Sequence, residues 1–173
     1  MIGQLTRILK KRVGQGLVET ALIFPIFLIV VFGVMQLGHI AAMTIVVNHA
    51  AFEVARIGAI ASEGFTPGQA ASCANAQINV RKMNSVADKI FEKWPGKVVS
   101  PLKWSVVKTL QDPEAKRNNC DLVVELQYQL PLIFPFINVA LAQPPHGGHS
   151  EVGMYRLLLG SARMPLEVPI WSN

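Results

Sequence analysis

The stretch that decides the fold of this chain is GQGLVETALIFPIFLIVVFGVM, residues 14–35. Four basic residues precede it, at positions 7, 10, 11 and 12, and no acidic residue occurs before Glu19. A basic segment, a glycine, one carboxylate and an apolar run therefore follow one another. The carboxylate is the unusual feature, because an ionised Glu at the mouth of a bilayer-spanning helix is costly unless something neutralises it.

The apolar run continues with few polar breaks over residues 17–47. About 20 such residues are enough to cross a bilayer, so the first part of the run predicts one transmembrane helix. The basic flank places the N-terminus in the cytoplasm by the positive-inside rule. A cleaved signal peptide is the rival interpretation, but low polarity extends past residue 35 and no small-x-small exit follows. Pro25 is expected to kink or loosen the span.

The second half of this helix is predicted to be amphipathic. From residue 45 onward, apolar residues recur at helical spacing, and His49, Glu53 and Arg56 form the opposite polar stripe. We therefore expect one continuous helix over about residues 15–61, whose second half packs on a soluble domain. Gln36 and His39 share a helical face and are interpreted as markers of the outer interface, with a polar helix–helix contact as the alternative.

Charge excludes one class of function. The net charge is +5, but four of the 16 Lys and Arg residues lie before Gly14 and all 11 acidic residues lie after it, which leaves 12 − 11 = +1 for the remainder. The basic excess thus concerns membrane orientation, and no nucleic-acid partner is expected. Both cysteines, Cys73 and Cys120, lie beyond the apolar run, and in an exported, oxidising compartment they predict one disulfide.

Residues 62–173 are predicted to form a small α+β domain. Thr66 and Pro67 begin a predicted second helix that extends to about residue 93, where Pro95 and Gly96 end it. Period-two alternation predicts strands near residues 102–106 and 122–130, and a third strand is expected at 154–168. The expected fold class is therefore a membrane-anchored α+β protein with a long N-terminal helix, a second helix and a small antiparallel sheet of about three strands.

Residues 131–142, PLIFPFINVALA, are too short to span a bilayer and unusually apolar for a loop. They are interpreted either as an arm that covers the core or as an exposed patch that docks a partner. The following segment, residues 144–149, is predicted to be a mobile loop. Its two histidines, His146 and His149, have no carboxylate or thiol beside them, so we predict no metal site.

Gly14, with Glu19 five residues later and the apolar run behind it, resembles the processing site of type IV pilins and pseudopilins. The whole stretch over residues 14–38 is similar to TadE-like minor pseudopilins of tight-adherence (Flp, type IVb) pilus systems. Thr20 follows the Glu where major pilins of these systems usually carry an aromatic residue, which favours a minor subunit.

The resemblance implies cleavage by a prepilin peptidase after Gly14, which would leave Gln15 as the first mature residue. It divides the chain into a cytoplasmic leader (1–14), a transmembrane helix (15–40), the extracytoplasmic half of the long helix (41–61) and a periplasmic domain (62–173). It also implies partners, namely other Tad minor pilins, the major pilin, inner-membrane platform proteins with their ATPase, and membrane lipid.

An enzyme and a cofactor are not expected, because the chain lacks the common nucleophile, phosphate-loop and metalloprotease motifs. The new α-amine of Gln15 and the carboxylate of Glu19 are expected to neutralise one another between neighbouring subunits. The alternative is an unprocessed bitopic anchor in the inner membrane that carries an extracytoplasmic binding or sensor domain.

Overall fold

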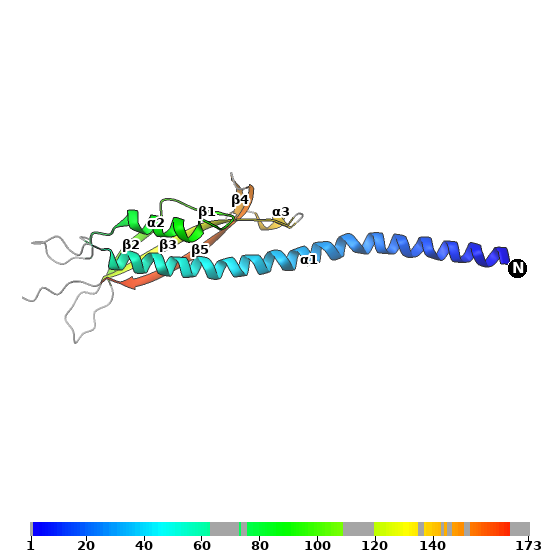
Figure 1. Ribbon diagram of the computed structural model, residues 1–173, viewed down its shortest axis with the longest axis horizontal. Helices are drawn as coiled ribbons and strands as arrows, with labels where there is room; N and C mark the ends of the chain where they lie inside the picture. Colours follow the sequence, from blue (N-terminus) through cyan, green and yellow to red (C-terminus); the bar gives the residue numbers. More distant parts are fainter. Residues whose placement is uncertain are drawn as a thin grey trace, which may run out of the picture.

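One helix, α1 (Ile2–Ile60), runs along most of the length of the protein in the computed structural model (Figure 1). The structure describes residues 2–62, 73, 76–108, 120–134, 137–142, 144, 147–150 and 153–166, with side chains from residue 16. The remaining elements are α2 (Val80–Phe91), β1 (Lys97–Val98), β2 (Lys103–Lys108), β3 (Cys120–Pro131), α3 (Asn138–Leu141), β4 (Gly147–Ser150) and β5 (Gly153–Pro165).

The long helix contains 59 residues, or about 90 Å at 1.5 Å per residue. Its predicted continuity and its end near residue 61 are confirmed, and Pro25 lies within it. The helix begins at Ile2 instead of Gln15, because residues 2–13 hold mostly good helix formers and no proline. The N-terminal half of α1 projects away from the rest of the molecule, and its C-terminal half lies along the sheet (Figure 1).

The sheet is fully antiparallel and centred on β3. Its order is β1-β3-β5-β4, and β2 pairs with β3 along the same edge as β1. The predicted alternation of β3 is confirmed, since every second residue is buried: Leu122, Val124, Leu126, Tyr128 and Leu130. The third predicted strand is also present, as β5.

The described residues form five strands instead of the expected three or so. The added strands β1 and β4 are only 2 and 4 residues long, too short to show a period in the sequence. The prediction of a loop at residues 144–149 is wrong from Gly147 onward, because β4 pairs with β5 and places His149 opposite Met154. β4 and β5 follow one another in the chain, and their cross-strand pairing overrides the preference of Gly147 and Gly148 for turns.

The second helix is shorter than predicted. Residues 76–79 are not helical, and Asn79 caps the helix by accepting a hydrogen bond from the backbone N–H of Lys82 at 3.1 Å. The predicted start at Thr66 and Pro67 lies outside the described residues. The buried residues of α2 recur every four positions, at Met83, Ala87 and Phe91, so one face of this helix packs into the core.

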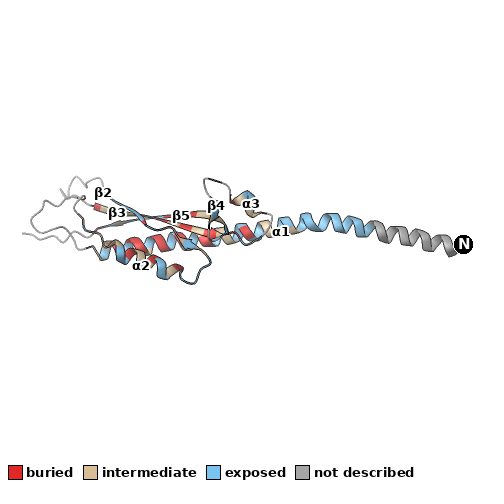
Figure 2. Cartoon of the chain, turned by 90° about the horizontal axis from the view of Figure 1, so that it is seen from above, coloured by how far each residue is buried: buried red, intermediate tan, exposed pale blue. Residues whose placement is uncertain are grey.

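The core lies between the sheet and the two helices, which both cover the face carrying the even-numbered residues of β3 (Figure 2). Phe91 of α2 stacks on Tyr128 with ring centroids 4.4 Å apart. Close packing of α1 on β5 depends on Gly160, because a Cβ there would lie 2.7 Å from the carbonyl oxygen of Val47. The sheet therefore has one dry face and one open face.

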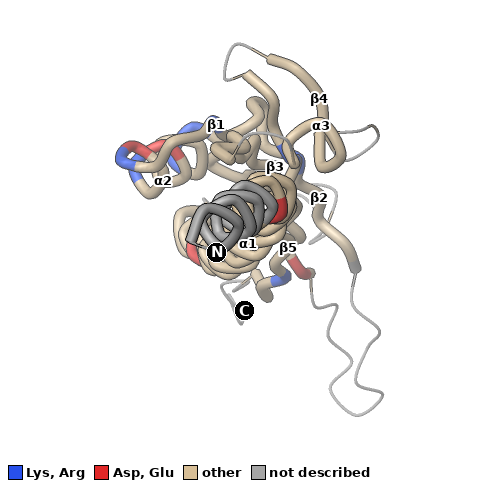
Figure 3. The backbone as a smooth tube through the Cα atoms, turned by 90° about the vertical axis from the view of Figure 1, so that its right-hand side faces the viewer, with Lys and Arg blue, Asp and Glu red and all other residues tan. Residues whose placement is uncertain are grey.

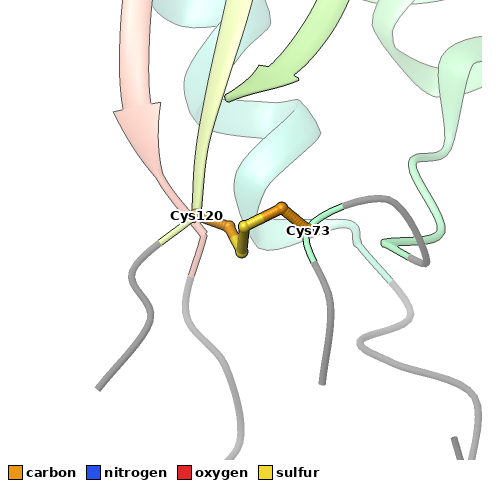
Figure 4. The surroundings of a disulfide bond; sticks show 2 residues. All are labelled: Cys73 and Cys120. Carbon is orange, nitrogen blue, oxygen red and sulfur yellow. A yellow bond between two sulfur atoms is a disulfide. The ribbon is translucent and has the colours of Figure 1, made fainter. Parts of the chain in front are cut away.

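Cys73 and Cys120 form a disulfide, as the sequence predicts (Figure 4). The bond joins the segment between α1 and α2 to the first residue of β3, across a sequence separation of 47. A cross-link over that length of chain contributes about 3–4 kcal/mol in the chain-entropy model, because it restricts the unfolded ensemble.

Candidate functional site

The candidate site comprises the N-terminal, projecting part of α1 and the junction at which this helix meets the folded domain. Gly14, Gln15 and Glu19 all lie within α1, and the side chain of Glu19 is exposed. Thr20 donates its hydroxyl hydrogen bond to the carbonyl oxygen of Gly16 at 2.9 Å, so this polar side chain is satisfied within the helix. The processing residues thus lie on a regular helix one turn before the apolar run.

The projecting part of α1 is apolar on every side. None of the side chains of residues 16–35 is buried, and large apolar residues such as Leu22, Ile26 and Val30 are more than half exposed. No charged residue occurs between Glu19 and Glu53. A helix that is apolar all round and not covered by protein is typical of a membrane span, and α1 is long and apolar enough to cross a membrane.

Further along, α1 turns into a helix with one buried side. Its buried residues follow helical spacing and are Gln36, Met43, Val47, Ala50, Ala51, Val54, Ala55 and Gly58. This stripe confirms the predicted amphipathic half and extends it toward the N-terminus. On the opposite side, the predicted pair of Arg56 and Glu53 is present, with the guanidinium 2.8 Å from the carboxylate. Seen along α1, charged residues gather on α2 (Figure 3).

The apolar segment comprises residues 131–142, and its described residues, 131–134 and 137–142, pack on α1 at the junction between the projecting and packed halves. Phe134 stacks on Phe32 with centroids 5.7 Å apart, and Ile137 lies over Gly33. Leu132 and Ala142 are buried, whereas Ile133 and Val139 are 57% and 63% exposed. The segment therefore has a buried side, as a core arm does, and an exposed apolar side as well.

Gln36 joins the apolar segment to α1. Its side chain is fully buried, and its Oε1 accepts hydrogen bonds from the backbone N–H groups of Ile133 and Phe134, both at 3.2 Å. The amide oxygen of Gln36 therefore acts within its own chain, and the position of Gln36 at the outer membrane interface stays a prediction. Gly33 is covered by Ile137, whereas a Cβ at Gly38 would meet no described atom within 4 Å.

Sequence reasoning missed these junction residues because they lie about a hundred positions apart. A signal was nevertheless present: the single amide side chain between residues 16 and 47, together with a charge-free segment too short to span a bilayer. The described residues contain no group of three or more metal-ligating side chains, and His149 is exposed in β4. His146 lies outside the described residues.

An apolar projecting helix whose continuation packs on one face of an antiparallel sheet defines an α+β protein with a candidate single-pass membrane anchor. Residues 14–56 match the family described as TadE-like protein, which confirms the recognition made from the sequence over this segment. No curated protein and no solved structure matched the chain.

The family match covers the candidate processing segment and the junction but ends before α2 and the sheet. It supports a component of a Tad pilus system in general, which interacts with other pilus components. The TadE-like family is not an enzyme family. The apolar helix at the N-terminus fits a single-pass membrane anchor.

Proposed function

We propose that the protein is a minor pseudopilin of a Tad pilus system, processed after Gly14 by a prepilin peptidase. The observation that carries the proposal is the position of Glu19. It is the single acidic residue among the first 52, it lies within the TadE-like match, and its exposed side chain begins a charge-free apolar helix. A carboxylate at this place needs a cationic partner when the helix enters lipid.

Cleavage after Gly14 supplies such a partner. It removes the four basic residues at positions 7, 10, 11 and 12 and frees an α-amine on Gln15. An amine on one subunit and the Glu19 carboxylate on its neighbour neutralise one another, and the pair sets the axial offset between the two helices. The apolar surface around residues 22–30 is then available for helix packing with other Tad minor pilins and the major pilin.

The proposed topology follows the division expected from the sequence. The leader (1–14) lies in the cytoplasm, residues 15–40 form the membrane helix, and residues 41–61 with the domain (62–173) lie in the periplasm or in the assembled pilus. The disulfide between Cys73 and Cys120 supports an oxidising location for the domain. Platform proteins of the inner membrane are the proposed docking partners before assembly.

Mass spectrometry of the mature N-terminus, on protein from native envelopes, tests the proposal. A first residue of Gln15 supports processing, and its loss in Gly14→Phe shows that the small residue is required, because a bulky side chain blocks the peptidase. Gly38→Phe is the matched control: a Cβ at Gly38 has open space around it, so that variant should be cut normally. An uncut chain in the wild type would instead favour the bitopic anchor.

A further inference from the structure

The projecting part of α1 is too short to cross a bilayer without help from the domain. With the carboxylate of Glu19 at the inner boundary, residues 20–31 lie before the first ring contact with the domain, at Phe32. Twelve residues rise only about 18 Å, whereas the hydrocarbon core of a bilayer is about 30 Å thick. The remaining hydrocarbon must therefore surround α1 beyond Phe32, where the apolar segment is packed against it.

The apolar segment has the surface for this environment. Residues 131–142 contain no charged residue, and the side chains of Ile133 and Val139 are exposed beside a stretch of α1 in which Val34 and Leu37 are 67% and 58% exposed. Such apolar surface, next to a membrane-spanning helix, is stabilised by contact with lipid rather than water. In Figure 2, α3 lies next to the exposed stretch of α1, at the end of the domain that faces the N-terminus.

Several backbone N–H groups of the segment also have hydrogen-bond partners within the protein, as a medium without water requires. Non-helical backbone is tolerated at membrane depth only where its polar groups are satisfied by protein. The N–H of Leu132 bonds the carbonyl oxygen of Met154 at 2.9 Å, and those of Ile133 and Phe134 bond Gln36. In the short helix α3, the N–H groups of Ala140 and Leu141 donate hydrogen bonds to the carbonyl oxygen of Ile137.

A cation lies at the end of the segment that would be nearest the lipid headgroups. Arg156 of β5 donates from Nη1 to the carbonyl oxygen of Leu141 at 3.2 Å and remains partly exposed. A guanidinium is favoured among lipid headgroups, where its charge meets phosphate while its stem covers apolar surface. Its position at the C-terminal end of α3 is consistent with the segment entering lipid up to that point.

We propose that the apolar segment inserts into the outer leaflet of the bilayer beside α1, so that the domain rests on the membrane through a second lipid contact. The inference depends on α1 crossing the membrane and not on processing after Gly14. Before assembly, this contact would hold the domain at a fixed height and orientation, with the carboxylate of Glu19 kept at the opposite boundary.

Single-cysteine labelling tests the insertion. The native cysteines are joined in the disulfide, so one added cysteine can carry an environment-sensitive dye in full-length protein reconstituted into phosphatidylethanolamine and phosphatidylglycerol vesicles. Three valine replacements are matched: Val139→Cys in the apolar segment, Val30→Cys in the projecting helix and Val107→Cys in β2. The three valines are 63%, 59% and 42% exposed, and Val107 lies at the far end of the sheet, opposite Asp121.

The expected result is strong quenching of the dye by spin-labelled lipid at Val30→Cys and Val139→Cys, with little at Val107→Cys. Quenching of the Val139→Cys dye by aqueous iodide alone would overturn the proposal. A dye that is shielded from both quenchers is covered by protein and also overturns it. If lipid failed to quench the dye at Val30→Cys, α1 would not cross the membrane, and the inference would be overturned as well. An uncut N-terminus, in contrast, would contradict only the proposed processing after Gly14.

Discussion

Gln36 and Ile133 are joined by a hydrogen bond of 3.2 Å between residues 97 positions apart in the sequence, from a backbone N–H to a fully buried side-chain oxygen. The same oxygen also accepts from Phe134. The bond fixes the apolar segment to α1 where the projecting helix meets the domain. It therefore links the part of the chain that carries the processing residues to the part that forms the sheet.

Gln36→Leu should detach the apolar segment from α1. The change leaves the N–H groups of Ile133 and Phe134 without their acceptor, at a cost of about 1–3 kcal/mol for each group that stays buried. Faster hydrogen exchange at these two amides, in detergent-solubilised protein, is the measurement. The control is Gln127→Leu on the half-buried, open side of β3, for which those exchange rates should not change. Unchanged exchange in Gln36→Leu would show that the bond does not hold the segment.

Glu19→Gln should leave insertion into the membrane intact and impair incorporation into the pilus machinery, because the neutral amide cannot pair with the amine of a neighbouring subunit. Co-purification with other Tad pilus components from native membranes measures the effect. Glu53→Gln is the control on the same helix, where only the pair with Arg56 is lost, worth a few tenths of a kcal/mol. Normal co-purification of the Glu19→Gln protein would refute the neutralisation mechanism.

Tyr128 makes stability fall at alkaline pH. Burial raises the pKa of its phenol from 10.0 to about 12, and the buried hydroxyl has no hydrogen-bond partner among the residues that the structure describes. Between these two pH values the unfolded chain releases the proton and the folded chain keeps it, so the free energy of unfolding decreases as pH rises. The contribution present below pH 10 is about 2–3 kcal/mol at most.

Tyr128→Phe isolates this contribution. Phe keeps the stacking on Phe91 and removes the unpartnered hydroxyl, so at neutral pH the variant should be as stable as the wild type or more stable by about 1 kcal/mol. The difference in unfolding free energy, measured by denaturant titration, should then grow in favour of Phe as pH rises from about 10 to about 12. A difference that stays constant over this range would contradict the assignment.

Gly160→Ala should destabilise the contact between β5 and α1. The added Cβ would lie 2.7 Å from the backbone oxygen of Val47, so the helix has to move, and overpacking of this kind costs about 1–3 kcal/mol. The measured quantity is the thermal midpoint in detergent. Gly38→Ala is expected to have the opposite sign, because a Cβ at that position meets nothing and alanine favours the helix. Equal midpoints for the two variants would show that α1 and β5 are less closely packed.

Removal of the disulfide should cost about 3–4 kcal/mol, since the unfolded chain regains the freedom of the closed loop. The double variant Cys73→Ser, Cys120→Ser and the reduced wild type should both unfold at lower denaturant concentration than the oxidised protein. A reducing agent should leave the double variant unchanged, which separates loss of the bond from other effects of the reagent. Equal midpoints for oxidised and reduced wild type would contradict the expected stabilisation.

The sequence by itself determined the features that have a local period or a local charge pattern. The apolar run and its basic flank predicted the projecting helix, the stripe from Val47 to Gly58 predicted its packed half, and the alternation from Leu122 to Leu130 predicted β3. In each case neighbouring residues repeat the same spacing of apolar side chains, so the helix or strand can be predicted without knowing which segments it packs against.

Only the tertiary structure decided where the apolar segment lies, what Gln36 bonds, and that the short β1 joins the sheet. These outcomes depend on contacts between residues far apart in the chain. A two-residue strand or a single buried amide has too little local preference of its own, and its conformation is selected by the hydrogen bonds that a distant segment offers.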